Sequence, residues 1–329
     1  MKTLNAETVW HMPSDELVLL IENRAFSNRT GKIRFYAPSF VHYKNKYFRT
    51  SHDAFPSISI TGSSCALKCE HCNGKVLDTM VPAMSQKELF NLCARLEKSG
   101  AEGCLISGGC LPDGSVPLGK FIDTIAKIKK ELKLTVFVHT GIIDFSTAKQ
   151  LKDAGVDAAL IDVIGSDETI KKTCNLNVTV EDYVNSLNAM QQADLTLVPH
   201  VIVGLHDGEL KGELYALKMI AAVKPSAVVV IAFMPIHGTA MAKVKPPHPA
   251  DIAKVTAVAR LTFPKIPIAL GCVRPKGKHR AETDILALKA GVNAIAFPSE
   301  EVVKFAEEQG YTFSFSSYCC AQIYADTAF

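Results

Sequence analysis

The chain lacks several features that mark common classes of protein. Its 329 residues contain no block of like charges, and 36 Lys and Arg stand against 33 Asp and Glu, a net charge of +3. That balance gives no reason to expect nucleic acid or an anionic membrane as a partner. No apolar run is long enough to span a bilayer, and the first residues, MKTLNAETVW, lack the apolar core of a signal peptide. We therefore expect a cytoplasmic chain.

Internal repeats and low-complexity stretches are missing as well. Hydrophobic residues make up 48% of the chain against 21% charged residues, which allows a sizeable core and excludes a disordered chain. Ten cysteines are present. In a chain kept reduced, they are expected as metal ligands, reactive thiols or core residues instead of disulfides.

Short β-rich runs alternate with helical patterns from about residue 55 onward. The runs are apolar and rich in Val, Ile, Leu or Ala, as expected of parallel strands buried on both faces. They cover Phe55–Thr61, Gly103–Ser107, Leu134–Thr140, Asp157–Ile164, Thr196–Val203, Ala227–Phe233, Ile266–Gly271 and Ala294–Phe297. The helical patterns that follow them cover Gln86–Lys98, Leu118–Leu132, Thr147–Ala154, Val180–Ala193, Leu210–Val223, Pro249–Leu261, Ala281–Ala290 and Ser299–Gln309.

This alternation predicts an α/β fold, a (β/α)8 TIM-type barrel that is complete or nearly so. An open doubly wound sheet is the alternative, and the absence of a nucleotide-binding glycine fingerprint makes it the weaker one. We expect an N-terminal extension packed on the barrel (1–50), the barrel itself (51–310) and a C-terminal tail that contains cysteines (311–329). Functional residues of such barrels lie where strands end and loops begin.

Three cysteines follow the first predicted strand. Cys65, Cys69 and Cys72 have C-x3-C-x2-C spacing on a loop that contains glycine and serine. Thiolates are soft ligands that select iron–sulfur clusters or zinc. A structural zinc site needs four ligands, and His71 is the candidate for the fourth, although residues adjacent in the chain rarely bind one tetrahedral ion together. Three thiolates on a four-iron cluster leave one iron open for chemistry.

This motif and its position resemble the radical S-adenosylmethionine (SAM) enzymes. The resemblance implies that the three cysteines hold a [4Fe–4S] cluster, whose open iron binds the amino and carboxylate groups of SAM. It implies that SAM is cleaved to a 5′-deoxyadenosyl radical, with an electron donor of the ferredoxin or flavodoxin type as a partner. Further strand ends match the family's SAM-contacting positions: Ser107, Gly108, Gly109, Asp162, Ile202, Gly204 and Pro235.

Each of these matches implies a role. The glycine pair resembles the one that contacts the methionine amino group, Asp162 resembles the residue that binds the ribose hydroxyls, and Ile202 and Gly204 fall in the adenine-side motif. In that motif, His200 and Asp207 stand where the family usually has glycine and glutamate.

Within the family, the eight-unit pattern resembles the biotin synthase group. Biotin synthase itself has second-cluster cysteines on its third and fifth strands, whereas the corresponding strands of this chain contain none, so we do not expect biotin synthase. The cysteines that remain at the predicted barrel rim and in the tail are candidate ligands of a second iron–sulfur cluster: Cys110, Cys174, Cys272, Cys319 and Cys320. Unconnected thiols are the alternative interpretation.

A second cluster would supply sulfur to an unactivated C–H carbon. In overall character the chain is similar to the split, archaeal-type lipoyl synthases, which implies an octanoyl group on a lipoyl carrier protein as substrate and a sister radical SAM subunit as partner. A radical mutase or C–C bond-forming enzyme of the methylornithine synthase kind is the alternative that needs one cluster. An iron–sulfur electron carrier or scaffold that never cleaves SAM is the alternative from another class.

Positive charge is concentrated after the seventh predicted strand, where Arg274 and Lys276 lie. Arginine forks bind carboxylates, so we expect this loop to contact a substrate carboxylate or an acidic carrier protein. A solvated loop is the alternative.

Overall fold

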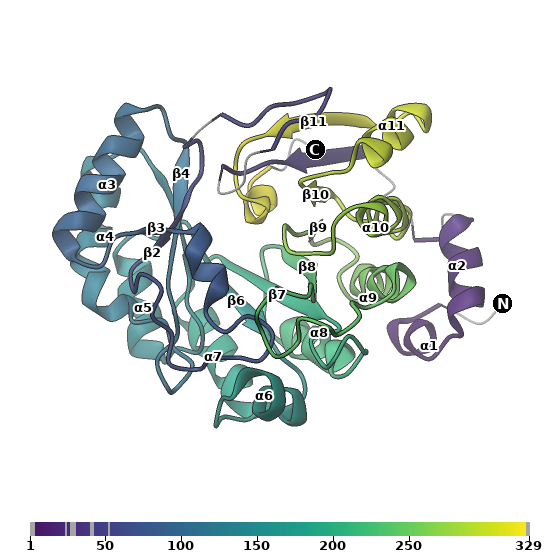
Figure 1. The fold of residues 1–329 in the computed structure, drawn as a ribbon, viewed down its shortest axis with the longest axis horizontal. Helices are drawn as coiled ribbons and strands as arrows, with labels where there is room; N and C mark the ends of the chain where they lie inside the picture. The colour runs from purple at the N-terminus through teal and green to yellow at the C-terminus, as the bar shows by residue number, and fades with distance from the viewer. Residues whose placement is uncertain (1–3, 24, 27–30, 40–42, 52, 327–329) are drawn as a thin grey trace.

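A single parallel sheet forms the centre of the computed structural model, which describes residues 4–23, 25–26, 31–39, 43–51 and 53–326 (Figure 1). In this part of the chain the sheet has 11 strands, in the order β11-β1-β10-β9-β8-β7-β6-β5-β4-β2-β3. The strands are β1 (Lys32–Tyr36), β2 (Ser57–Ser59), β3 (Val81–Pro82), β4 (Gly103–Ser107), β5 (Thr135–His139), β6 (Ala158–Val163), β7 (Leu197–Val203), β8 (Val228–Ala232), β9 (Ile268–Leu270), β10 (Ala294–Ala296) and β11 (Thr312–Ser316).

Helices cover the outer face of the curved sheet (Figure 1). The α-helices are α1 (Ala6–Trp10), α2 (Ser14–Glu22), α3 (Gln86–Lys98), α4 (Ile122–Glu131), α5 (Phe145–Asp153), α6 (Asp167–Cys174), α7 (Val180–Gln192), α8 (Glu213–Ala222), α9 (Pro249–Thr262), α10 (Lys278–Lys289) and α11 (Glu300–Glu308). Short 3₁₀ helices are η1 (Lys75–Thr79), η2 (Leu118–Phe121) and η3 (Cys320–Tyr324). Among the described residues, none of these helices has both the length and the apolar character that crossing a membrane requires.

Local sequence explains why the elements form. Every residue of β8 is buried, as expected of a β-branched strand covered on both faces. Capping boxes begin two helices, Ser85 with Glu88 for α3 and Thr179 with Asp182 for α7. The eight predicted strands are confirmed as β2 and β4–β10, and they follow one another across the sheet in sequence order.

The curved sheet is open, so the prediction of a complete or nearly complete barrel is wrong in its closure. The edge of β10 that would meet β2 in a closed barrel is occupied by β1, with Arg34 opposite Ala294. β11 then pairs with β1, with Phe35 opposite Phe315. The two extra strands therefore extend one edge of the sheet and keep it away from β2 and β3.

The residues predicted as an extension and a tail both supply strands to this sheet. β1 comes from the first 50 residues and β11 from the last 20, while α1 and α2 pack against α9 on the outside. The sheet thus runs across both of the boundaries that the sequence suggested.

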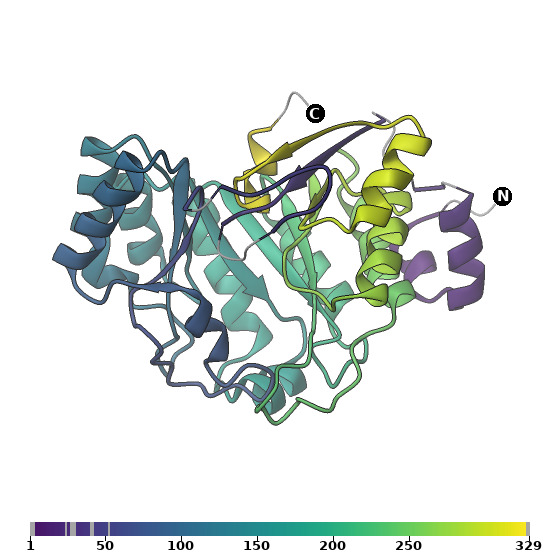
Figure 2. The same cartoon turned by 45° about the horizontal axis from the view of Figure 1, so that its top comes forward.

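The C-terminal segment, residues 317–326, covers part of the inner, concave face of the sheet (Figure 2). The Tyr318 ring lies 5.6 Å from that of Phe55, and the Tyr324 ring lies 6.2 Å from that of Phe137, both measured between centroids. The Tyr324 hydroxyl also donates to the Asp157 carbonyl over 3.2 Å. The segment therefore connects the strands at one side of the open sheet with β11 at the other.

A fully buried ion pair holds the loop after β9. The Arg274 side chain has no exposed surface, and its Nε donates to Asp284 Oδ1 over 2.7 Å. Its other nitrogens donate to the carbonyls of Gly271 at 2.6 Å and Phe297 at 3.2 Å. The prediction that Arg274 contacts a substrate carboxylate or a carrier protein is therefore wrong, because internal partners use its donors. Lys276, two residues on, is exposed, and its predicted role is not tested by this geometry.

Arg274→Ala leaves the Asp284 carboxylate buried without its ion-pair partner. We expect a loss of about 3–5 kcal/mol in the free energy of unfolding, the usual cost of removing one member of a buried pair. Denaturant titration measures it, with Lys276→Ala as a control that changes stability by less than about 0.5 kcal/mol. Wild-type stability in Arg274→Ala would contradict the structural role.

Candidate functional site

The three-cysteine loop begins after β2, at the carboxyl ends of the parallel strands. Cys69 and Cys72 are buried and Cys65 is half-buried. The sulfur atoms of Cys69 and Cys72 and a ring nitrogen of His71 all lie within 4.8 Å of one another. Cys65 is not part of this close group, but its charge helps to raise the pKa of both Cys69 and Cys110. The loop therefore brings three thiols to one end of the molecule, with a histidine among them.

Hydrogen bonds attach this loop to its neighbours. The Ala66 amide donates to the Cys110 carbonyl over 2.8 Å, and the Cys69 thiol donates to the Cys174 carbonyl over 3.2 Å. The loop is thus held both by the residues after β4 and by the end of α6. Because the segment after β4 and the end of α6 both fix the loop, the thiols keep a defined position relative to the strand ends.

Gly109 allows the cysteine loop to approach β4 closely. A Cβ atom at this position would lie 2.0 Å from the Ser64 carbonyl oxygen and 2.7 Å from Cys65 Cα. The Gly109 amide donates to Thr61 Oγ1 over 2.7 Å. Packing against the loop is therefore sufficient to explain why this position is glycine, without any contact to a ligand. The methionine contact that the family resemblance implies for Gly108 and Gly109 stays a prediction.

The buried thiols hold their protons when no metal is bound. The contact with Cys174 is the largest cause that raises the pKa of Cys69, and the contact with Cys69, followed by burial, raises the pKa of Cys72 to about 12. Metal binding must therefore displace protons from these sulfurs. Three thiols on one loop, two of them buried, are a donor set that fits an iron–sulfur cluster.

The predicted SAM-contact residues lie at the carboxyl ends of the strands, as the cysteine loop does. They stand at or just after the ends of four strands, β4, β6, β7 and β8: Ser107, Gly108, Gly109, Asp162, Ile202, Gly204 and Pro235. Asp162 lies beside His139, the last residue of β5, and His200, which lies in β7. Burial raises the pKa of Asp162, but the charges of His139, His200 and His71 outweigh that effect and lower it to about 2. The carboxylate is therefore ionised near neutral pH.

Glu213 is a site residue that the sequence reasoning missed. Its Oε1 accepts the Gly204 amide over 2.9 Å, at the turn where Gly204 has φ of +73°. Asp207, which stands at the family's usual glutamate position, forms an ion pair with Lys172 instead. Burial raises the pKa of Glu213 to about 7. The signal that could have identified Glu213 was a carboxylate that follows the adenine-side motif a few residues later than the family's usual glutamate position.

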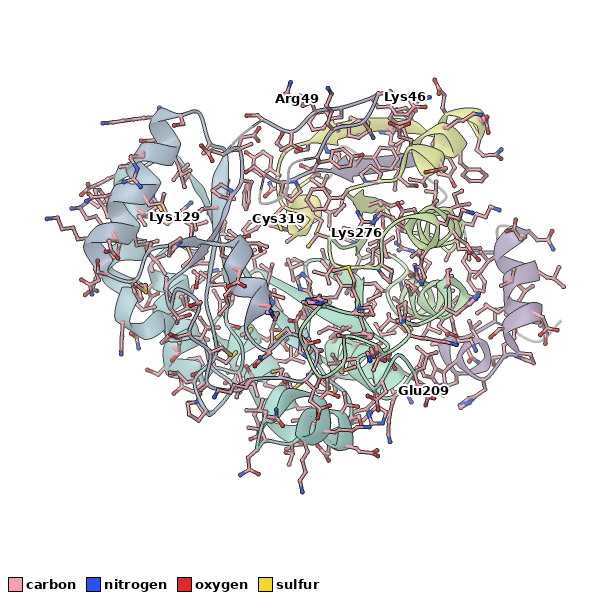
Figure 3. All side chains as sticks on the ribbon, viewed as in Figure 1. Lys46, Arg49, Lys129, Glu209, Lys276 and Cys319 are labelled. Carbon is pink, nitrogen blue, oxygen red and sulfur yellow. The ribbon has the colours of Figure 1, made fainter. Side chains whose placement is uncertain are left out.

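The five candidate ligands of a second cluster separate into two groups. Cys110 and Cys174 lie beside the cysteine loop. Cys272, Cys319 and Cys320 lie on the inner face, where each affects the pKa of another, and Figure 3 labels Cys319 near the middle of the view. Their sulfur atoms are less closely grouped than the donors of the cysteine loop. The five thiols therefore do not share one site.

Comparison with known proteins supports one family. Residues 59–212 match the family model described as the Radical SAM superfamily. This segment, just under half of the chain, is similar to a radical SAM domain, and the relatives that match support the same superfamily. It is 29% identical over 191 residues to a biotin synthase of Leptospira biflexa, a match that covers 58% of this chain and 53% of the relative. The chain thus spans about half the length of that relative, and further biotin synthases match as well, which places it in the biotin-synthase-like group.

Two solved structures share the fold of this chain. HydG, a maturase of the [FeFe]-hydrogenase, matches with a TM-score of 0.66 at 18% identity, over 99% of this chain and 74% of that one. Methylornithine synthase (PylB) matches with a TM-score of 0.62 at 16% identity, over 94% of this chain and 93% of that one. At these identities the likeness shows the fold alone. Family membership implies a [4Fe–4S] cluster and SAM as cofactors, and the cysteine loop suits the cluster.

Replacing Cys69 or Cys72 with Ala should abolish cluster retention and SAM cleavage together, because a three-thiolate site loses one of its ligands. Iron content and 5′-deoxyadenosine formation in anaerobic preparations measure the two losses. Cys65→Ala and Cys110→Ala form a matched pair, because a backbone hydrogen bond from Ala66 joins their two segments. We expect the cluster to be lost only in Cys65→Ala, and the reverse result would make Cys110 the third ligand.

Glu213 should make the stability of the fold depend on pH. Its folded pKa of about 7 lies above the unfolded value of 4.5, so its stabilising effect is complete below pH 4.5 and is lost as the pH rises through 7. Gln at this position stays neutral and avoids the loss. At 1.36 kcal/mol per pKa unit, the difference in the free energy of unfolding is up to about 3 kcal/mol. Thermal unfolding at pH 5 and pH 8 should show Glu213→Gln gaining on wild type at pH 8. An unchanged difference between the two proteins would refute this pKa.

Proposed function

We propose that this radical SAM enzyme inserts sulfur at an unactivated C–H carbon, acting as a lipoyl synthase-like enzyme on an octanoyl group carried by a protein. The observation that carries the proposal is the inner-face thiol group, Cys272, Cys319 and Cys320, which lies apart from the cysteine loop. When bound, the [4Fe–4S] cluster and SAM supply a 5′-deoxyadenosyl radical that abstracts hydrogen from carbon. A second set of sulfur ligands would hold the cluster that delivers the sulfur.

The inner-face thiols have the surroundings that a second iron–sulfur cluster requires. Cys319 and Cys320 are 9% and 2% exposed, and Cys272 follows β9 on the same face. Burial raises the pKa of Cys272 to about 12, whereas contacts with Cys320 and nearby amide groups lower the pKa of Cys319. Soft sulfur donors shielded from water suit iron. We assign Cys272, Cys319 and Cys320 as its ligands.

The substrate belongs to the same proposal. The inner face around the thiols is apolar and includes Leu105 and Ile202, which suits an alkyl chain. Exposed Lys276 would contact an acidic lipoyl carrier protein. A ferredoxin or flavodoxin as electron donor, a sister radical SAM subunit and a cytoplasmic setting complete the proposal.

Iron and sulfide analysis after anaerobic reconstitution tests the second cluster. We expect about eight irons per chain in the wild type and about four in the variant Cys272→Ser/Cys319→Ser/Cys320→Ser, since one [4Fe–4S] cluster contains four. The variant should still form 5′-deoxyadenosine but fail to add sulfur to an octanoyl-lysine peptide, as read by mass spectrometry.

The same measurements separate the alternatives. About four irons in the wild type, with SAM cleavage intact, would refute the second cluster and favour a single-cluster mutase or C–C bond-forming enzyme of the methylornithine synthase kind. A wild-type protein that binds iron but forms no 5′-deoxyadenosine under a strong reductant would be an electron carrier or scaffold.

A further inference from the structure

Three nitrogen and oxygen donors gather on neighbouring strands of the inner face, close enough to Cys319 for its charge to act on His139. His139 ends β5, Asp162 lies in β6 and His200 in β7. Asp162 and His200 are direct partners in the β6–β7 register, and His139 pairs with Leu160, two residues before Asp162. Side chains two residues apart on a strand point to the same face, so the register places all three on one face.

The donor atoms are close enough to share a small ligand. One ligand atom from each of the three residues lies within 4.8 Å of the other two. His139 Nε2 is 3.6 Å from Asp162 Oδ2, and the two imidazole rings are 5.8 Å apart between centroids. Ligands of one metal ion lie about 3 Å apart when each bond is near 2.1 Å, so small rotations of these side chains close the site.

Two atoms of this group are buried without a partner. His200 is 8% exposed, and its Nδ1 accepts or donates no hydrogen bond to any described residue. Asp162 Oδ1 is likewise buried and unpaired. An unsatisfied buried polar atom costs about 1–3 kcal/mol, so two of them in one place call for a missing partner such as an ion.

The charges of the group suit a cation. Asp162 is ionised, and the burial of His200 lowers its pKa to about 4, which leaves its imidazole neutral and its lone pair free. Burial works against protonation of His139, but the Asp162 charge outweighs it and raises its pKa.

We propose that His139, Asp162 and His200 bind one divalent transition-metal ion on the inner face of the sheet. Two imidazoles and one carboxylate are borderline-to-hard donors that suit zinc or ferrous iron, unlike the all-thiol sites of this chain. Three protein ligands leave at least one position open for a polar group of the substrate. The ribose contact implied for Asp162 uses one of its carboxylate oxygens, and the metal uses the other.

Zinc binding to the cluster-loaded, SAM-free protein tests this site independently of catalysis. Iron already occupies the thiol ligands in that form, so equilibrium dialysis against zinc, followed by metal analysis, reports the remaining donors. We expect about one zinc per chain in the wild type and at least ~100-fold weaker binding in His139→Ala and in His200→Ala. The zinc absorption edge should show only nitrogen and oxygen neighbours at about 2.0–2.2 Å.

Two controls keep the test sharp. His206→Asn changes another buried histidine just after β7, and Cys272→Ser/Cys319→Ser removes the nearby thiols; both should retain zinc. His200→Gln, with circular dichroism to verify folding, separates loss of a ligand from loss of the fold. No zinc in the wild type, sulfur neighbours at about 2.3 Å, or zinc lost with the thiols and kept in His200→Gln would each overturn the proposal. None of these outcomes depends on sulfur insertion, so either proposal can fail alone.

Discussion

The contact between the backbone after β4 and the cysteine loop is the constraint on which the site depends. Gly109 leaves the space that Ser64 and Cys65 occupy, and the Ala66 amide fastens the loop to the Cys110 carbonyl. Because β4 is hydrogen-bonded to β2 on one side and β5 on the other, the thiols are fixed relative to every other strand end. The proposed cluster, the SAM contacts and the inner-face groups therefore share one rigid frame.

Local patterns made most of the fold predictable. β4 and α3 lie at their predicted bounds because one is a continuous apolar run and the other begins with a capping box. Closure was not predictable in this way. It depends on which strand occupies the free edge of β10, and β1 is a five-residue segment whose partners lie far away in the sequence.

The candidate site shows the same division between local and distant information. The cysteine spacing is local, so the sequence pointed to it directly. Arg274 belongs to a basic run that is typical of an exposed loop, and only the position of Asp284 in α10 shows that it is buried. His139, Asp162 and His200 come from three strands, so their meeting depends on register, which residue types alone do not specify.

The position of β1 between β10 and β11 has a consequence for biosynthesis. A ribosome makes residues 32–36 long before both neighbours of that strand, β10 and β11, which come much later in the sequence. Until then β1 has no partner and the inner face lacks its C-terminal cover. Such long-range pairing slows folding and leaves apolar edges exposed to aggregation in the unfinished chain. The cysteine loop, in contrast, is followed soon in the sequence by β4, which holds it. Its thiols are therefore made before the rest of the sheet is complete.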